Sequence, residues 1–149
     1  MRILLLMGLL VMAARCVAHE AESSYLVLTE ADAVMQGHWA VPLTSLDKAL
    51  NLVEDGGRDL LWGDIVRNQN RIQDYVFSSL QIKIDQEQCD VVAQDVMLEQ
   101  LSSGLHVHLP FVLNCEGDRP RSAPLSVHSS LLQKLNPDFK TLFRFSGLD

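Results

Sequence analysis

The sequence has 149 residues, of which 48% are hydrophobic and 21% are charged, and its formal net charge is −7 at pH 7. This length suits one domain that buries a substantial core. The negative charge has the wrong sign for a protein that binds nucleic acid or anionic lipid headgroups.

Residues 1–18 have the pattern of a secretory signal peptide. Arg2 supplies a positive charge, and the run from Ile3 to Ala14 is apolar throughout. This run is too short to cross a bilayer, which requires roughly 20 apolar residues. Cys16-Val17-Ala18 then places small residues where a signal peptidase requires them, so the sequence predicts cleavage before His19.

Cleavage at this point leaves residues 19–149 as a single mature domain with no expected membrane span. The predicted location is the periplasm or the extracellular space. Retention of residues 1–18 as a membrane anchor stays open as an alternative. Lipidation at Cys16 is disfavoured because Arg15 stands where a lipoprotein signal requires a small residue.

Cys89 and Cys115 are the two cysteines left after the signal is removed. An even pair in an oxidising compartment predicts a disulfide. Closing the loop between them corresponds to a stabilisation of about 3–4 kcal/mol. A two-thiolate metal site is the alternative, but the sequence lacks the close Cys-x-x-Cys or Cys-x-His spacing that such sites use.

Three short strands are expected in the first third of the chain. They cover Ser24–Glu30, Gly37–Leu43 and Ala49–Val53, and the third ends at the strong turn signal Glu54-Asp55-Gly56-Gly57. Pro42 indicates an edge position or a bulge at the end of the second strand, because proline cannot donate a hydrogen bond to a ladder.

A helical period follows this turn. From Asp64 to Leu80 the larger apolar residues recur with helical spacing between polar ones, and Asp64 suits the N-terminal turn. The pattern predicts one amphipathic helix of about four turns.

Alternation of apolar and polar residues then returns. The expected strands are Leu80–Asp85, Val91–Leu101, Leu105–Cys115, Leu125–His128 and Thr141–Phe145, with a hairpin between the second and third of them. The predicted fold class is mainly β: an antiparallel β-sandwich, Ig-like, with one amphipathic helix in a connection.

Three segments carry a resemblance to a known family: Tyr25–Glu30, Trp39–Pro42 and Trp62-Gly63-Asp64. In this order the sequence resembles the extracytoplasmic N-terminal region of HupE/UreJ-type bacterial membrane proteins. The resemblance implies a β-rich head that precedes a multi-helix part associated with nickel or cobalt transport. It also implies a membrane protein as partner. The sequence ends at Asp149, before any such part, so a transport activity is not carried over.

In relatives, the segment before the Trp-Gly-acid motif can resemble a calcium loop. Asn51, Asp55, Gly56 and Asp64 echo this pattern, but Trp62 takes the twelfth position, where calcium loops require a bidentate glutamate. We therefore expect a turn that caps the helix and no calcium site.

His106 and His108 are the first candidates for metal ligands. They alternate within a predicted strand, which places both imidazoles on one face, about 7 Å apart. Such a pair can contribute to a nickel, copper or zinc site. Two ligands are too few by themselves, however, so we expect both histidines on the polar face of an exposed strand, with Leu105, Val107 and Leu109 facing the core.

His19 is a third candidate ligand, because cleavage before it would offer an α-amino group and an imidazole to one copper ion. The sequence places no further ligand beside it. His38 and His128 fall in strand-like segments, where we expect them to line the surface.

The sequence contains no pattern that marks a catalytic residue. It lacks a Gly-x-Ser-x-Gly nucleophile elbow, and Gly56-Gly57 is followed by Arg58-Asp59 rather than by the Lys-Ser or Lys-Thr of a phosphate-binding loop. We therefore expect no enzymatic activity and no cofactor. The predicted function is a non-catalytic extracytoplasmic domain for interaction or assembly, and the alternative is a soluble transition-metal-binding protein.

Overall fold

The computed structural model describes residues 22–31, 34–53, 59–116 and 123–147. The predicted signal peptide, His19 and the turn at Glu54–Gly57 lie outside these residues.

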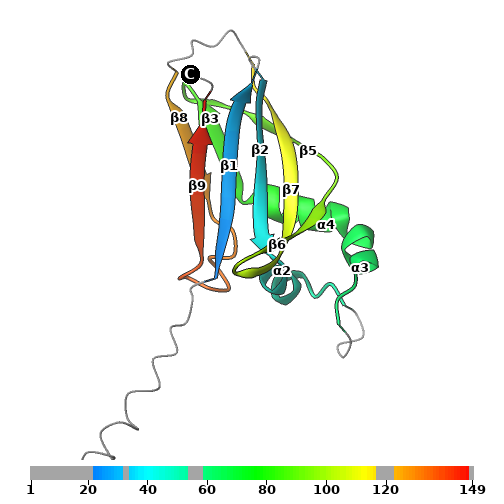
Figure 1. Ribbon diagram of the computed structural model, residues 1–149. Coiled ribbons are helices and arrows are strands. Elements are labelled where there is room, and N and C mark those ends of the chain that lie inside the picture. The colour runs from blue at the N-terminus through cyan, green and yellow to red at the C-terminus, as the bar shows by residue number, and fades with distance from the viewer. Residues whose placement is uncertain (1–21, 32–33, 54–58, 117–122, 148–149) are drawn as a thin grey trace, which may run out of the picture.

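The larger sheet has six strands (Figure 1). They are β1 (Ser23–Ala31), β2 (Val34–Pro42), β5 (Asp90–Ala93), β6 (Met97–Leu101), β7 (Gly104–Asn114) and β9 (Lys140–Ser146). Their order is β5-β7-β2-β1-β9, and β6 pairs with β7 as well. The pair β1–β9 is parallel and the other pairs are antiparallel.

A smaller antiparallel sheet and three helices cover one face of the larger sheet. The small sheet has the order β4 (Glu87–Gln88), β3 (Leu80–Ile84) and β8 (Leu125–Ser129). The helices are α2 (Leu43–Leu50), α3 (Trp62–Arg67) and α4 (Gln69–Ser78). In Figure 1, β3 and β8 lie behind β1 and β9, and α4 lies behind β7. We call the covered face of the larger sheet its inner face and the opposite one its outer face.

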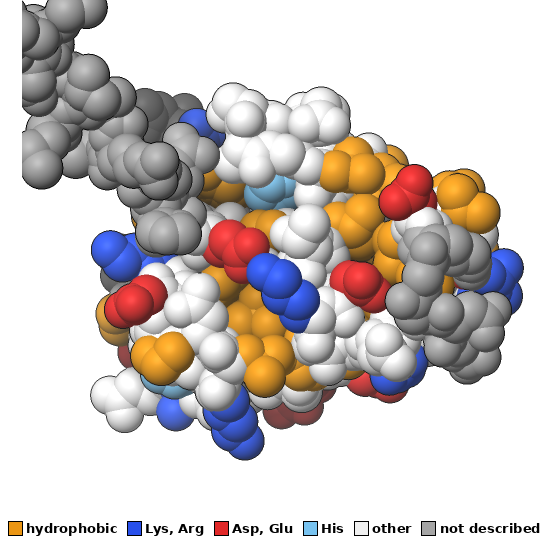
Figure 2. Space-filling view, turned by 90° about the horizontal axis from the view of Figure 1, so that it is seen from below, with side chains coloured by type: hydrophobic (Ala, Val, Ile, Leu, Met, Phe, Trp, Pro, Cys, Tyr) orange, Lys and Arg blue, Asp and Glu red, His pale blue; other side chains and the backbone are white. Residues whose placement is uncertain are grey.

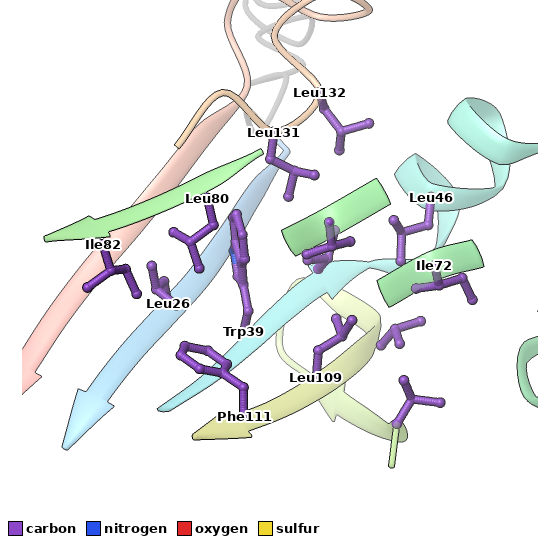
Figure 3. Packing of buried hydrophobic residues seen from close by; sticks show 14 of the residues in the cluster. Leu26, Trp39, Leu46, Ile72, Leu80, Ile82, Leu109, Phe111, Leu131 and Leu132 are labelled. Carbon is purple, nitrogen blue, oxygen red and sulfur yellow. The ribbon is translucent and has the colours of Figure 1, made fainter. Parts of the chain in front are cut away.

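Alternation along the strands places one apolar series in the core. Leu26 and Leu28 of β1, Trp39 of β2 and Leu109 and Phe111 of β7 are fully buried. They pack in one cluster with residues of β3, α2 and α4, among them Leu80, Ile82, Leu46, Ile72 and Val76. Figure 3 shows Trp39 in the middle of this cluster.

A chain of polar side chains crosses this core. Trp39 Nε1 donates to Ser24 Oγ at 3.0 Å, and Ser24 Oγ donates to Thr141 Oγ1 at 3.0 Å. Thr141 Oγ1 lies 3.3 Å from Ser129 Oγ. The chain therefore joins β2, β1 and β9 of the large sheet to β8 of the small one, and it supplies the partner that a buried indole N–H requires.

Gly37 sits where no side chain fits. A Cβ at this position would lie 2.6 Å from Leu28 Cδ2, 2.7 Å from Phe111 Cζ and 2.7 Å from the carbonyl oxygen of Val27. The Phe111 ring thus occupies the space that a side chain would need.

Replacing Gly37 with alanine should destabilise the domain by about 1–3 kcal/mol, the usual effect of overpacking a core. Urea denaturation measures the loss. Gly63 offers a matched control, since the nearest atom to a Cβ there is Arg67 Nη1 at 3.3 Å, the far end of a flexible, exposed side chain. An equal effect of the two alanine variants would contradict the packing described for Gly37.

The fold class expected from the sequence is confirmed: the protein is mainly β, with antiparallel sheets and short helices. The expected strand at Ala49–Val53 is wrong. Residues 43–50 form α2, because Leu43, Leu46 and Leu50 recur with helical spacing and bury one side of the helix. Asn51 ends it in a left-handed conformation with φ 49°.

Two further elements are divided where single ones were expected. The predicted helix over 64–80 forms α3 and α4, which meet at Asn68. The predicted strand Val91–Leu101 forms β5 and β6, which pair with opposite ends of β7. Pro42 pairs with His106 of β7 but lies beyond Ala40, the last residue of β2 that pairs with β1, so the end of this strand has the expected edge position. The helix α2 begins directly after Pro42.

A disulfide joins Cys89 and Cys115, with their sulfur atoms 2.03 Å apart. It lies next to Asp90 and Asn114, which are paired at the end of the β5–β7 ladder. Cys89 is buried. The bond therefore closes the end of this ladder inside the packed structure.

Candidate functional site

The outer face of the large sheet carries three histidines: His38 on β2 and His106 and His108 on β7. His108 pairs with Ala40 and His38 with Pro110, so His38 and His108 occupy diagonal positions on neighbouring strands. Their rings stack with centroids 4.6 Å apart and an interplanar angle of 19°. The structure thus brings together the rings of His38 and His108, rather than those of His106 and His108, which the sequence had suggested as a pair.

Glu99 of β6 holds the His108 ring from the other side. His108 Nδ1–H donates to Glu99 Oε2 at 3.0 Å, and only 17% of the His108 side chain is exposed. A carboxylate bonded to Nδ1 fixes the orientation of the ring and leaves Nε2 as its second functional nitrogen.

The environment of His38 favours its neutral form. Burial is the largest cause that lowers the pKa of His38, and the neighbouring charges of His108 and Arg144 lower it further, while Glu99 acts in the opposite direction. Because the pKa lies below its ordinary value of 6.5, the His38 imidazole is neutral at pH 7.

His106 does not lie on an exposed polar face, so the expectation from the sequence is wrong for this residue. It is fully buried, its ring lies 6.0 Å from that of Tyr25, and its Nδ1–H donates to the carbonyl oxygen of Gly104 at 2.9 Å. Its Nε2 is buried without a hydrogen-bond partner among the described residues. Leu105, which was expected in the core, is 40% exposed.

The remaining histidines are not part of this group. His128 lies on β8 of the small sheet, and His19 lies outside the described residues. Within the described part of the chain, no three histidine, cysteine, aspartate or glutamate side chains gather in a way that could hold a metal ion. His106 and His108 are therefore not completed into a larger ligand set there.

Asp64 has a structural role at the start of α3. Its side chain is almost fully buried, its Oδ2 accepts the backbone N–H of Leu61 at 2.9 Å, and it pairs with Arg67. This arrangement caps the helix, as expected. Asp55 and Gly56, which echo a calcium loop in the sequence, lie outside the described residues.

A second feature is the edge strand β9. Leu142, Phe143 and Phe145 are 51%, 45% and 44% exposed, which is high for large apolar side chains on a strand. A groove of about 390 Å³ runs beside them between β8 and β9. Lys140 and Arg144 are exposed on the same strand and form no ion pair with any residue that the structure describes.

A smaller hollow of about 270 Å³ lies at the end of the molecule that carries α2. It is lined by Leu132, Leu135 and Phe139 and by the ion pair of Glu22 with Lys48. Figure 2 looks onto this end, where hydrophobic surface lies between acidic and basic side chains. The apolar side chains there come from several segments, whereas the exposed apolar side chains of β9 come from one strand, on which they alternate with Lys140 and Arg144 or lie on its other face.

No protein-family model matches the sequence, and no curated protein or solved structure is significantly similar to it. In the described residues, no helix is both long enough and apolar enough to cross a membrane. Any statement about function therefore rests on the residues themselves.

Proposed function

We propose that this protein is a non-catalytic extracytoplasmic recognition domain, of the kind that heads HupE/UreJ-type membrane proteins, and that it binds an extended segment of a partner protein along β9. The exposed apolar edge of β9 is the observation that carries this proposal. The disulfide supports export, since such bonds persist in oxidising compartments.

An edge strand can accept a further strand because the backbone N–H and C=O groups along its free edge are not paired with another strand. Soluble proteins usually protect such edges with charges, bulges or short strands. β9 is seven residues long and keeps three large apolar side chains exposed. Strand addition uses the backbone for affinity and alternate side chains for specificity.

The charges of β9 indicate the chemistry of the partner. β9 pairs with β1 such that Leu142 lies beside Tyr25 and Arg144 beside Val27, so Lys140, Leu142 and Arg144 share the outer face. An added strand with an acidic, an apolar and an acidic residue at alternate positions would complement this row. The two cations stand out in a protein of net charge −7.

The residues that carry the family resemblance have structural roles in this domain. Trp39 and Leu26 belong to the core, and Asp64 caps α3. The resemblance therefore rests on residues that build the core and cap a helix, and the proposed recognition role does not depend on metal transport.

Photocrosslinking in the cells that produce the protein tests the proposal. A benzophenone amino acid in place of Phe145 should give a discrete adduct, whereas the same group in place of Lys83, which is exposed on the small sheet, should give none. Charge reversal at Lys140 and Arg144 should reduce the adduct, and reversal at Lys134, outside β9, serves as the matched control. Equal adducts from Phe145 and Lys83, or none from Phe145, would contradict the proposal.

A further inference from the structure

We propose that His38 and His108 form a binding site for a borderline transition-metal ion, with Glu99 as the residue that positions the His108 ring. The observation is the stacked pair of imidazoles on two adjacent strands of the large sheet. This inference goes beyond the proposed recognition function and does not depend on it.

The backbone already brings the two imidazoles close together. Both residues lie on strands with neighbours on either side, β2 and β7, and their ring centroids are 4.6 Å apart. A metal–nitrogen bond is about 2.0–2.1 Å long, so two nitrogens bound to one ion lie within about 4 Å of each other. In the stacked arrangement the in-plane lone pairs of the two rings run nearly parallel. The His38 ring must therefore turn about its last side-chain torsion, which has broad minima, to direct its nitrogen at the same ion as His108.

Glu99 places the His108 ring in the state that a metal ligand requires. Because Nδ1–H donates to the carboxylate at 3.0 Å, Nε2 carries the free lone pair. A carboxylate that accepts the second N–H of a ligating histidine is a usual outer-shell partner in metal sites, where it orients the ring and raises its basicity.

His38 supplies the second lone pair. No described residue forms a hydrogen bond with the His38 ring, which stacks on the ring of His108. His106 is excluded as the second ligand because its ring is buried and its Nδ1 is bonded to Gly104.

The chemistry of the pair limits the ion to those that favour imidazole: copper, nickel and zinc. The described residues offer no third ligand within such a group, so water would complete the coordination. Cu²⁺ binds most strongly in the usual order of divalent ions, which makes it the most sensitive probe.

The test is a titration of the purified, exported protein with Cu²⁺ alone, followed by calorimetry and by electron paramagnetic resonance. We expect one site whose spectrum shows two imidazole nitrogens. His38→Gln and His108→Gln should each abolish it, and Glu99→Gln should lower the affinity about 10–100-fold, the usual effect of losing an outer-shell partner. His128→Gln, on the exposed face of the small sheet, is the matched control and should leave binding unchanged.

A second measurement uses the unaltered protein and so does not depend on the folding of any variant. Paramagnetic Cu²⁺ should broaden the ring resonances of His38 and His108 first. The proposal is overturned if no site is found, if the ring resonances of His128 broaden first, or if His19→Ala alone removes the binding.

Discussion

Replacing Trp39 with alanine should destabilise the domain by about 3–5 kcal/mol, the usual range for truncating a buried aromatic residue. Trp39 is fully buried in the middle of the cluster that joins the two sheets and the helices (Figure 3). A native domain is stable by only about 5–15 kcal/mol, so this single change would remove a large part of that stability.

The other tryptophan provides the matched control. Trp62 begins α3 and is 48% exposed. Its replacement by alanine should change stability by about 0.5 kcal/mol or less, as is usual for surface positions. Urea denaturation of both variants measures the difference. Similar losses for Trp39→Ala and Trp62→Ala would contradict the central position of Trp39.

The hydrogen bond from Trp39 to Ser24 allows the contribution of packing to stability to be measured separately from that of hydrogen bonding. Ser24→Ala removes the acceptor of the indole N–H and leaves a buried donor unpaired, which costs about 1–3 kcal/mol. Trp39→Phe removes the donor and keeps most of the apolar volume. In the double variant the two losses should be less than additive, because both act on the same hydrogen bond.

The sequence allowed most strands to be predicted because their side chains alternate. β3 is the clearest case: Leu80, Ile82 and Ile84 are buried and Gln81 and Lys83 are exposed. α2 was missed because the segment from Leu43 to Val53 is short. Ala49–Val53 is a short, almost continuous apolar run, and such a run does not distinguish a strand from the end of a helix.

The stacked pair of histidines was beyond the reach of sequence reasoning for a different reason. His38 and His108 lie 70 positions apart, and only the register of β2 with β7 makes them neighbours. The alternation of His106 and His108 correctly indicated one face of a strand. It could not show that His106 is covered, since the ring that lies near it, that of Tyr25, comes from β1.

Loss of the disulfide should have the second large effect. Cys89 and Cys115 are separated by 26 residues, and a loop of this length corresponds to a stabilisation of about 3–4 kcal/mol through the restricted unfolded chain. The segment between them contains β5, β6 and β7, which together form one side of the large sheet. Without the bond, the unfolded chain gains conformational entropy. The folded protein keeps the same contacts between β5 and β7, so the loss of stability comes mainly from the unfolded state.

The double variant Cys89→Ala, Cys115→Ala tests this value with no free thiol and no new buried hydroxyl. Its free energy of unfolding should fall by about 3–4 kcal/mol, and its dependence on denaturant should become steeper, because an uncrosslinked chain exposes more surface when it unfolds. Reductant should destabilise the parent protein by a similar amount and leave the double variant unaffected. Two titratable thiols in the denatured, unreduced parent would show that the bond is absent.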